Sequence, residues 1–137
     1  MIPRDDRDIL VAARAVLIAT ALWAALTGWA YLVPSGQGMP QLSWIRVVVP
    51  TEVWGIAWIT AAGMTLLGLK FPRMVRYGLA AVTGLLVIWA LSFTISWIGD
   101  SSRAWVSAKN YAYIAVLVAS SSVLLASKGK CSVPDKP

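Results

Sequence analysis

The chain has 137 residues, of which 58% are hydrophobic and 13% are charged, and its formal net charge is +6. Soluble domains carry about 25% charged residues, so this balance excludes an ordinary soluble domain and indicates a chain embedded in a bilayer. The sequence contains no histidine and one cysteine, which excludes a histidine base or ligand and an internal disulfide.

Four long stretches lack charged residues, and each predicts one membrane-spanning helix. About 20 helical residues cross roughly 30 Å of hydrocarbon. Membrane-spanning strands are excluded because the stretches are too long and do not alternate. The sequence therefore predicts an all-α integral membrane four-helix bundle, built as two helical hairpins in one domain. The predicted helices cover residues 9–33, 51–69, 74–98 and 108–127, and a short tail covers 128–137.

The first predicted helix, residues 9–33, has two interpretations. The triplet from Ala19 to Ala21 resembles a signal-peptide cleavage site. The preceding segment MIPRDDRD is acid-rich, however, and Arg14 interrupts the start of the apolar stretch. We therefore expect a retained transmembrane helix.

The second predicted helix opens with PTEVWGIAWITAAG, residues 50–63, in which Glu52 is the only charged residue. A carboxylate in the first turn is favoured by the helix dipole by about 0.3 to 1 kcal/mol, and Arg46 is near enough in sequence to pair with it. The alternative is that Glu52 binds a proton or cation at the mouth of a carrier. Trp54 and Trp58 share one helix face, and we expect them to pack; a pocket for an aromatic or cationic ligand is the alternative.

Tryptophan is unusually frequent, with eight residues in the chain. Indole rings prefer the head-group layer of a bilayer. Trp89, Phe93 and Trp97 form a stripe on the third helix, for which we expect packing, again with a ligand pocket as the alternative. The predicted interfacial anchors are Trp29, Trp44, Trp97 and Trp105.

Small side chains recur along the fourth predicted helix at alternating spacings of four and three residues. Helices in lipid associate through close contacts that small residues allow, and a 3.5-residue period favours a left-handed crossing. Thr20, Ala24 and Gly28 form a second such series on the first helix. The two faces meet either within one chain or between chains. The predicted packing or oligomer face is Ala108, Ala112, Ala115, Ala119, Ser122 and Ala126.

Basic residues are unevenly distributed over the two sides of this topology. Nine of the 12 lie on the side that holds both chain ends and the second connection. Such a bias predicts that this side is cytoplasmic, in a bacterial inner membrane. Contact with anionic lipid head groups accounts for the positive charge and is worth about 1 kcal/mol for each basic residue. The sequence contains no nucleic-acid-binding motif. The predicted head-group contacts are Lys70, Arg73, Arg76, Lys128 and Lys130.

The residues predict no catalytic, cofactor-binding or metal-binding site, and hence no enzyme. Ser92 and the serines at 120–122 lack a base, and we expect their hydroxyls to bond helix carbonyls or neighbouring helices. Cys131, in the predicted tail, is either palmitoylated or a free thiol.

Three parts of the chain carry a resemblance: the run EVWGIAWITAAG, residues 52–63, the run WALSFTISWIGDSSRAWVSAKNYAYI, residues 89–114, and the lysine-bearing tail. Together they resemble small four-helix membrane proteins of actinobacterial phages. Some members of that group are described as holins or holin-like lysis proteins. The likeness extends from Arg14 to Ser127 and carries over no functional residue. It implies self-association that permeabilises the inner membrane or times lysis.

Two further functions remain open from the sequence. The chain is alternatively a structural or regulatory subunit of another membrane protein, such as a phage exclusion factor or an accessory subunit. Its outer tryptophans and small-residue face would then dock the partner. A third function is a small carrier with Glu52 and Trp54 at its mouth.

Overall fold

The computed structural model describes residues 4–33, 49–99 and 104–128, and the side chains among them at 9–33, 49–99 and 104–123. These residues form α-helices joined by turns and contain no strand, which confirms the predicted all-α class over the described ranges. The helices are α1 (Arg4–Leu32), α3 (Thr51–Leu67), α4 (Pro72–Gly99) and α5 (Ala104–Lys128).

Three helices begin before the predicted positions: α4 by two residues, at Pro72, and α1 and α5 by more. α1 starts at Arg4, within the charged leader, and α5 starts at Ala104, before Lys109. Charged side chains on long stems are compatible with a helical backbone because the head group reaches outward while the stem packs. A boundary drawn at the first charge therefore shortens the helix.

A tight turn ends α3 at Leu67, two residues before the predicted limit. The amide of Gly68 donates to the carbonyls of Met64 and Thr65 at 3.1 and 3.2 Å, and that of Phe71 donates to Leu67 O at 2.9 Å. α4 then starts at Pro72, a residue suited to the first helical position because its missing amide would have no partner there. The turn places α3 and α4 side by side.

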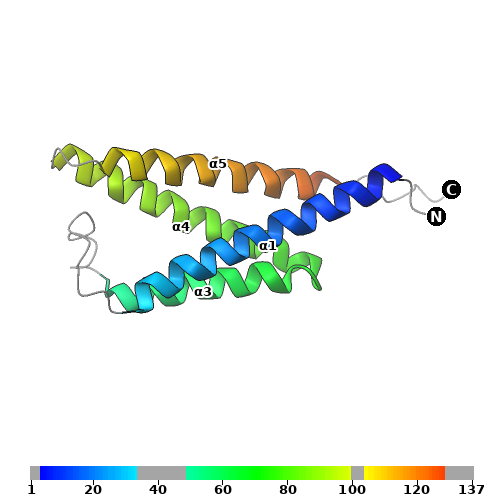
Figure 1. The fold of residues 1–137 in the computed structure, drawn as a ribbon, viewed down its shortest axis with the longest axis horizontal. Coiled ribbons are helices and arrows are strands. Elements are labelled where there is room, and N and C mark those ends of the chain that lie inside the picture. Colours follow the sequence, from blue (N-terminus) through cyan, green and yellow to red (C-terminus); the bar gives the residue numbers. More distant parts are fainter. Residues whose placement is uncertain (1–3, 34–48, 100–103, 129–137) are drawn as a thin grey trace.

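The helices form two antiparallel pairs, shown in Figure 1. α1 packs along α3 and α4 along α5; α3 and α4 join the pairs, whereas α1 and α5 touch only slightly. One end of the bundle holds the start of α1, the end of α5 and the α3–α4 turn, and we call it the turn end. The opposite end, where α1 and α4 end and α3 and α5 begin, is the loop end. This arrangement has the two predicted hairpins.

Glycine lets the backbones of α1 and α3 meet. A Cβ built at Gly28 would lie 2.8 Å from the carbonyl oxygen of Gly55, and one at Gly55 would lie 3.0 Å from that of Gly28. α3 and α4 approach equally closely, because a Cβ at Gly78 would lie 2.6 Å from the amide nitrogen of Thr65. Small residues at such crossings bring helices within van der Waals contact.

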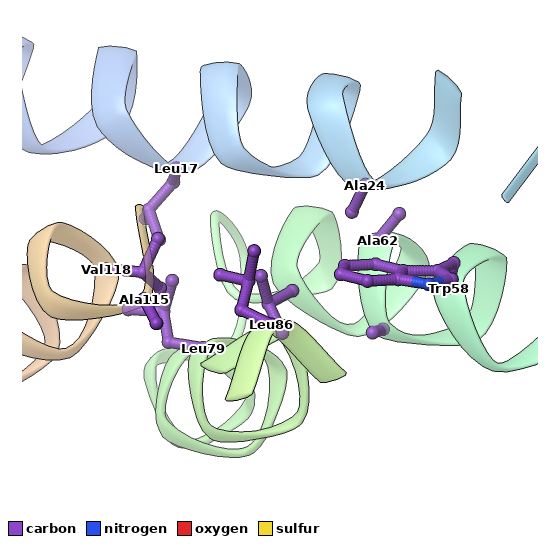
Figure 2. Packing of buried hydrophobic residues seen from close by; sticks show 10 residues of the cluster. Leu17, Ala24, Trp58, Ala62, Leu79, Leu86, Ala115 and Val118 are labelled. Atoms are coloured by element: carbon purple, nitrogen blue, oxygen red, sulfur yellow. The ribbon is translucent and has the colours of Figure 1, made fainter. Parts of the chain in front are cut away.

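The core between the pairs contains side chains from all four helices. Figure 2 shows Trp58 against Ala24 of α1, and Leu17 of α1 close to Val118 of α5. Thr65 and Ser92 are its buried polar residues among the described side chains. The labelled members of this cluster are Leu17, Ala24, Trp58, Ala62, Leu79, Leu86, Ala115 and Val118.

Two of the helices are long and apolar enough to cross a membrane, α1 over Ile9–Leu32 and α4 over its whole length. Most of the apolar stretch of α1 lies outside the protein core. α3 has 17 residues, which corresponds to about 25 Å of helix. The described bundle thus combines two long apolar helices with two others packed against them.

Candidate functional site

Aromatic side chains from all four helices meet inside the loop-end half of the bundle. Trp89 of α4 lies at the centre, 1% exposed. Its ring centroid is 4.7 Å from Trp54, 5.4 Å from Tyr31 and 6.1 Å from Trp58, each time edge to face. We call the whole group the aromatic cluster: Trp23, Tyr31, Trp54, Trp58, Trp89, Phe93 and Tyr111.

The outer members link α1 and α5 to this centre. Trp23 is 5.4 Å from Trp58 and 6.0 Å from Tyr111, and Phe93 stacks on Tyr111 at 5.5 Å. Aromatic pairs of this geometry are worth about 0.5 to 1.5 kcal/mol each beyond area burial. The cluster therefore ties α1 and α5 together although these two helices make little direct contact.

Polar atoms inside the cluster are only partly paired. The indole N–H of Trp89 donates to the hydroxyl oxygen of Tyr31. The buried Nε1 atoms of Trp54 and Trp58 have no hydrogen-bond partner among the described residues. Edge-to-face packing sets a positive ring edge against a negative ring face, which suits such groups.

Several hydroxyls donate to carbonyls of their own helices, whereas the buried Oγ1 atom of Thr83 has no hydrogen-bond partner among the described residues. Thr65 donates to Ala61 O at 2.8 Å, Ser92 to Ile88 O at 2.7 Å and Ser121 to Leu117 O at 2.8 Å. The expected bonding of Ser92 to a helix carbonyl is confirmed. These hydroxyls serve the helices, and none of the bonds positions a nucleophile beside a base.

A second feature lies outside the core, where α4 and α5 leave an open apolar groove of about 580 Å³. Small side chains from both helices line it, among them Ala90, Ala108 and Ala112. We call it the α4–α5 groove. Its remaining lining residues are Val87, Leu91, Thr94, Trp97, Trp105, Lys109, Ala115 and Val116.

The loop-end part of the groove has a different character. Trp97 and Trp105 lie there, about half exposed, and Lys109 follows one helical turn after Trp105. The ammonium group of Lys109 sits 5.0 Å from the centroid of the Trp105 ring, a cation–π contact. The groove thus joins an apolar strip to a cation flanked by indoles.

The structure separates the predicted tryptophans into two groups. Trp58 is 0% exposed and Trp54 half-buried, both in the aromatic cluster, whereas Trp29 is 64% exposed on α1. The stripe of Trp89, Phe93 and Trp97 divides, because eight helical residues turn about 80° beyond two full turns and leave Trp97 outside. Trp44 lies outside the described residues.

Glu52 lies exposed in the first turn of α3, after the extended residue Pro50. This position is the one at which the helix dipole favours a carboxylate. Its predicted partner Arg46 lies outside the described residues. The structure places Trp54 in the aromatic cluster, and the role of Glu52 and Trp54 in a carrier stays a prediction.

The small-residue stripe of α5 is used mainly within the chain. Ala108 and Ala115 are buried in the two core clusters, and Ala119 and Ser122 are half-buried. Ala112 is the exposed member and lines the α4–α5 groove. The side chain of Ala126 lies outside those that the structure describes.

The predicted head-group contacts gather at the turn end as far as they are described. Lys70, Arg73 and Arg76 are all exposed around the α3–α4 turn, and the Lys70 ammonium group is 5.8 Å from the Phe71 ring centroid. Lys130 and the side chain of Lys128 lie outside the described part.

Sequence reasoning assigned no site role to Tyr31, Tyr111 or Lys109. Tyr31 and Tyr111 are polar aromatics in apolar helices, and such residues usually find a partner when buried. Lys109 follows Trp105 by four residues, the spacing at which helical side chains touch. That spacing was a usable signal for the cation–π pair.

Comparisons of the chain with protein-family models, with curated proteins and with solved structures find no match. Function is therefore inferred from the residues and contacts of the chain itself.

Proposed function

We propose that the protein is a polytopic membrane protein that self-associates in a bacterial inner membrane and permeabilises it, in the manner of a holin. Its four helices cross the bilayer, with the turn end and both chain ends on the cytoplasmic side. It catalyses no reaction. The observation that carries the membrane placement is the apolar exterior of the bundle.

Large apolar side chains are exposed on every helix, for example Leu22 and Leu26 on α1, Ile56 on α3, Leu91 on α4 and Val116 on α5. Monomeric soluble proteins rarely expose apolar patches above a few hundred Å². In hydrocarbon the same side chains meet lipid tails at no cost. An apolar exterior over all four helices therefore supports a bilayer placement for α3 and α5 as well as for α1 and α4.

The proposed orientation has a direct test, since Cys131 is the sole cysteine of the chain. A membrane-impermeant maleimide should leave Cys131 unlabelled in intact cells and label it after the membrane is opened. Labelling in intact cells with normal membrane potential would reverse the assigned orientation.

Permeabilisation by several copies is supported by the filled interior of one bundle. The aromatic cluster occupies the space between the helix pairs, with Trp58 and Trp89 fully buried. A single chain therefore offers packed rings where a conduit would run through its loop-end half. A lesion would open between copies, which makes the effect depend on copy number and gives it a lag.

The test is controlled expression with membrane potential followed by a voltage-sensitive dye, alongside viable counts and crosslinking. We expect an abrupt collapse after a lag, together with crosslinked oligomers. Steady potential at native-like expression, with only monomers recovered, would overturn the proposal. A destabilised variant, Trp58→Ala, should lower the amount of folded protein and therefore lengthen the lag.

A second candidate is an accessory subunit, and it is favoured by the exposure of Ala112 beside the α4–α5 groove. A partner helix would pack there against small side chains. A tagged copy should then purify from native membranes with its partner. Recovery of a monodisperse chain without a partner would rule this candidate out.

A further inference from the structure

The α4–α5 groove has a polarity that matches one kind of molecule. Its sides are apolar and partly small, with Ala90, Ala108 and Ala112 leaving room between the helices. Its loop-end part carries Trp97, Trp105 and the cation Lys109. We propose that the groove binds an anionic phospholipid, with one acyl chain along the alanines and the phosphate at Lys109.

The length of the groove supports this occupant. It extends from Val87 to Trp97 on α4 and from Trp105 to Val116 on α5. Eleven or twelve helical residues span about 15 to 17 Å, and one leaflet is half of a hydrocarbon core of about 30 Å. An acyl chain that runs the depth of one leaflet therefore fits the groove end to end.

The charge and the rings at the loop-end part support the head group. Indole rings favour the interfacial layer, and lysine stems reach toward it. The Lys109 ammonium group is held 5.0 Å from the Trp105 centroid, and the described side chains lining the groove include no acid that would neutralise it. A lipid phosphate at this level would meet the Lys109 ammonium group beside the Trp105 ring.

This assignment rests on the membrane placement proposed above and does not depend on whether the protein permeabilises the membrane. The probe is the full chain reconstituted in phosphatidylcholine vesicles that contain brominated phosphatidylglycerol or brominated phosphatidylcholine. Bromine on the acyl chain quenches nearby tryptophans, and Trp97 and Trp105 line the groove. We expect phosphatidylglycerol to quench at about fivefold lower mole fraction, which corresponds to about 1 kcal/mol for one lysine near the surface.

Lys109→Gln should abolish the head-group preference. The matched control is Lys109→Arg, which retains a cation beside Trp105; this variant should keep the preference. Ala112→Leu should fill the groove and reduce quenching by both lipids. Ala112 is exposed, so helicity should be unchanged, which circular dichroism checks.

The head-group assignment would be overturned if the wild type and Lys109→Gln showed the same quenching with both lipids. If Ala112→Leu leaves quenching intact but removes crosslinked oligomers, the occupant is a second copy of the chain and the lipid proposal is overturned. Preferential quenching without collapse of membrane potential would overturn only the proposed permeabilising function. Collapse of potential without lipid preference would overturn only the lipid site.

Discussion

The α1–α3 and α4–α5 pairs are both antiparallel hairpins, yet they pack differently. α1 and α3 meet through Gly28 and Gly55, whose backbones touch, and the α3 residue Trp58 is completely buried. α4 and α5 meet through alanines and leave an apolar groove of about 580 Å³ with Trp97 at its edge. Glycine lacks the methyl group of alanine, so the glycine contacts let α1 and α3 approach closely. The alanine contacts between α4 and α5 leave an apolar surface open.

The two pairs therefore divide the described bundle into a half with a close glycine contact and a half with an open groove. Bilayer helices gain nothing from merely burying apolar area, since lipid is equally apolar, so packing decides stability. The glycine contact brings the backbones of α1 and α3 together, and the groove leaves apolar surface between α4 and α5 open. The following variants test that division.

Trp58→Ala should have the largest effect on stability. The residue is 0% exposed, and its loss leaves a cavity beside Trp23 and Trp89. We expect the free energy of unfolding to fall by about 3 kcal/mol, the lower end for such a change, because lipid removes the transfer term. Reversible unfolding in mixed detergent micelles measures it. Trp97→Ala, at a 49% exposed position, is the comparison and should cost far less; equal losses would contradict the division.

Gly28→Ala should disrupt the α1–α3 contact. The new methyl would lie 2.8 Å from the Gly55 carbonyl oxygen, a backbone atom that cannot turn aside. Overpacking of this kind costs about 1 to 3 kcal/mol, and we expect the upper part of that range. Gly84→Ala on α4 is the matched control, since a Cβ there meets no described atom within 4 Å. Equal stability of the two variants in the same micelle assay would show that the α1–α3 backbones do not touch.

Ala115→Leu and Ala112→Leu separate the two sides of α5. Ala115 is 6% exposed in the core, so the added bulk should lower the free energy of unfolding by about 1 kcal/mol, moderated because the residue also borders the groove. Ala112 is exposed, and its leucine should change stability by less than about 0.5 kcal/mol. Thermal aggregation in detergent compares the two. A greater loss of stability for Ala112→Leu would mean that Ala112, and not Ala115, faces the core.

Tyr31→Phe should have a small effect. It removes the acceptor of the Trp89 indole N–H and leaves the ring contact at 5.4 Å. Hydrogen bonds between membrane helices average about 0.6 kcal/mol, and we expect a loss of that size. A double-mutant cycle with Trp89→Phe isolates the bond. Tyr113→Phe, at a 67% exposed position, should change nothing; a coupling energy of zero would mean that the bond adds no stability.

Local features of the chain were predictable from the sequence. Hydropathy located all four described helices, because apolar stretches and helix length follow from composition alone. Their limits at Arg4, Leu67 and Ala104 differed from prediction because charge does not end a helix and because a turn consumed residues 68–71. The spacing of Ala112 and Ala115 identified a small-residue face but not which member stays exposed.

The sequence by itself determined the helical, apolar character of this protein and the separation of its basic residues, since these depend on residue type and order. Only the tertiary structure decided that Trp58 is buried while Trp97 is exposed, and that Ala112 borders a groove while Ala115 lies in the core. The reason is rotation about each helix axis. That rotation is set by contacts between distant residues, such as Gly28 with Gly55, and it determines which face of each helix remains free.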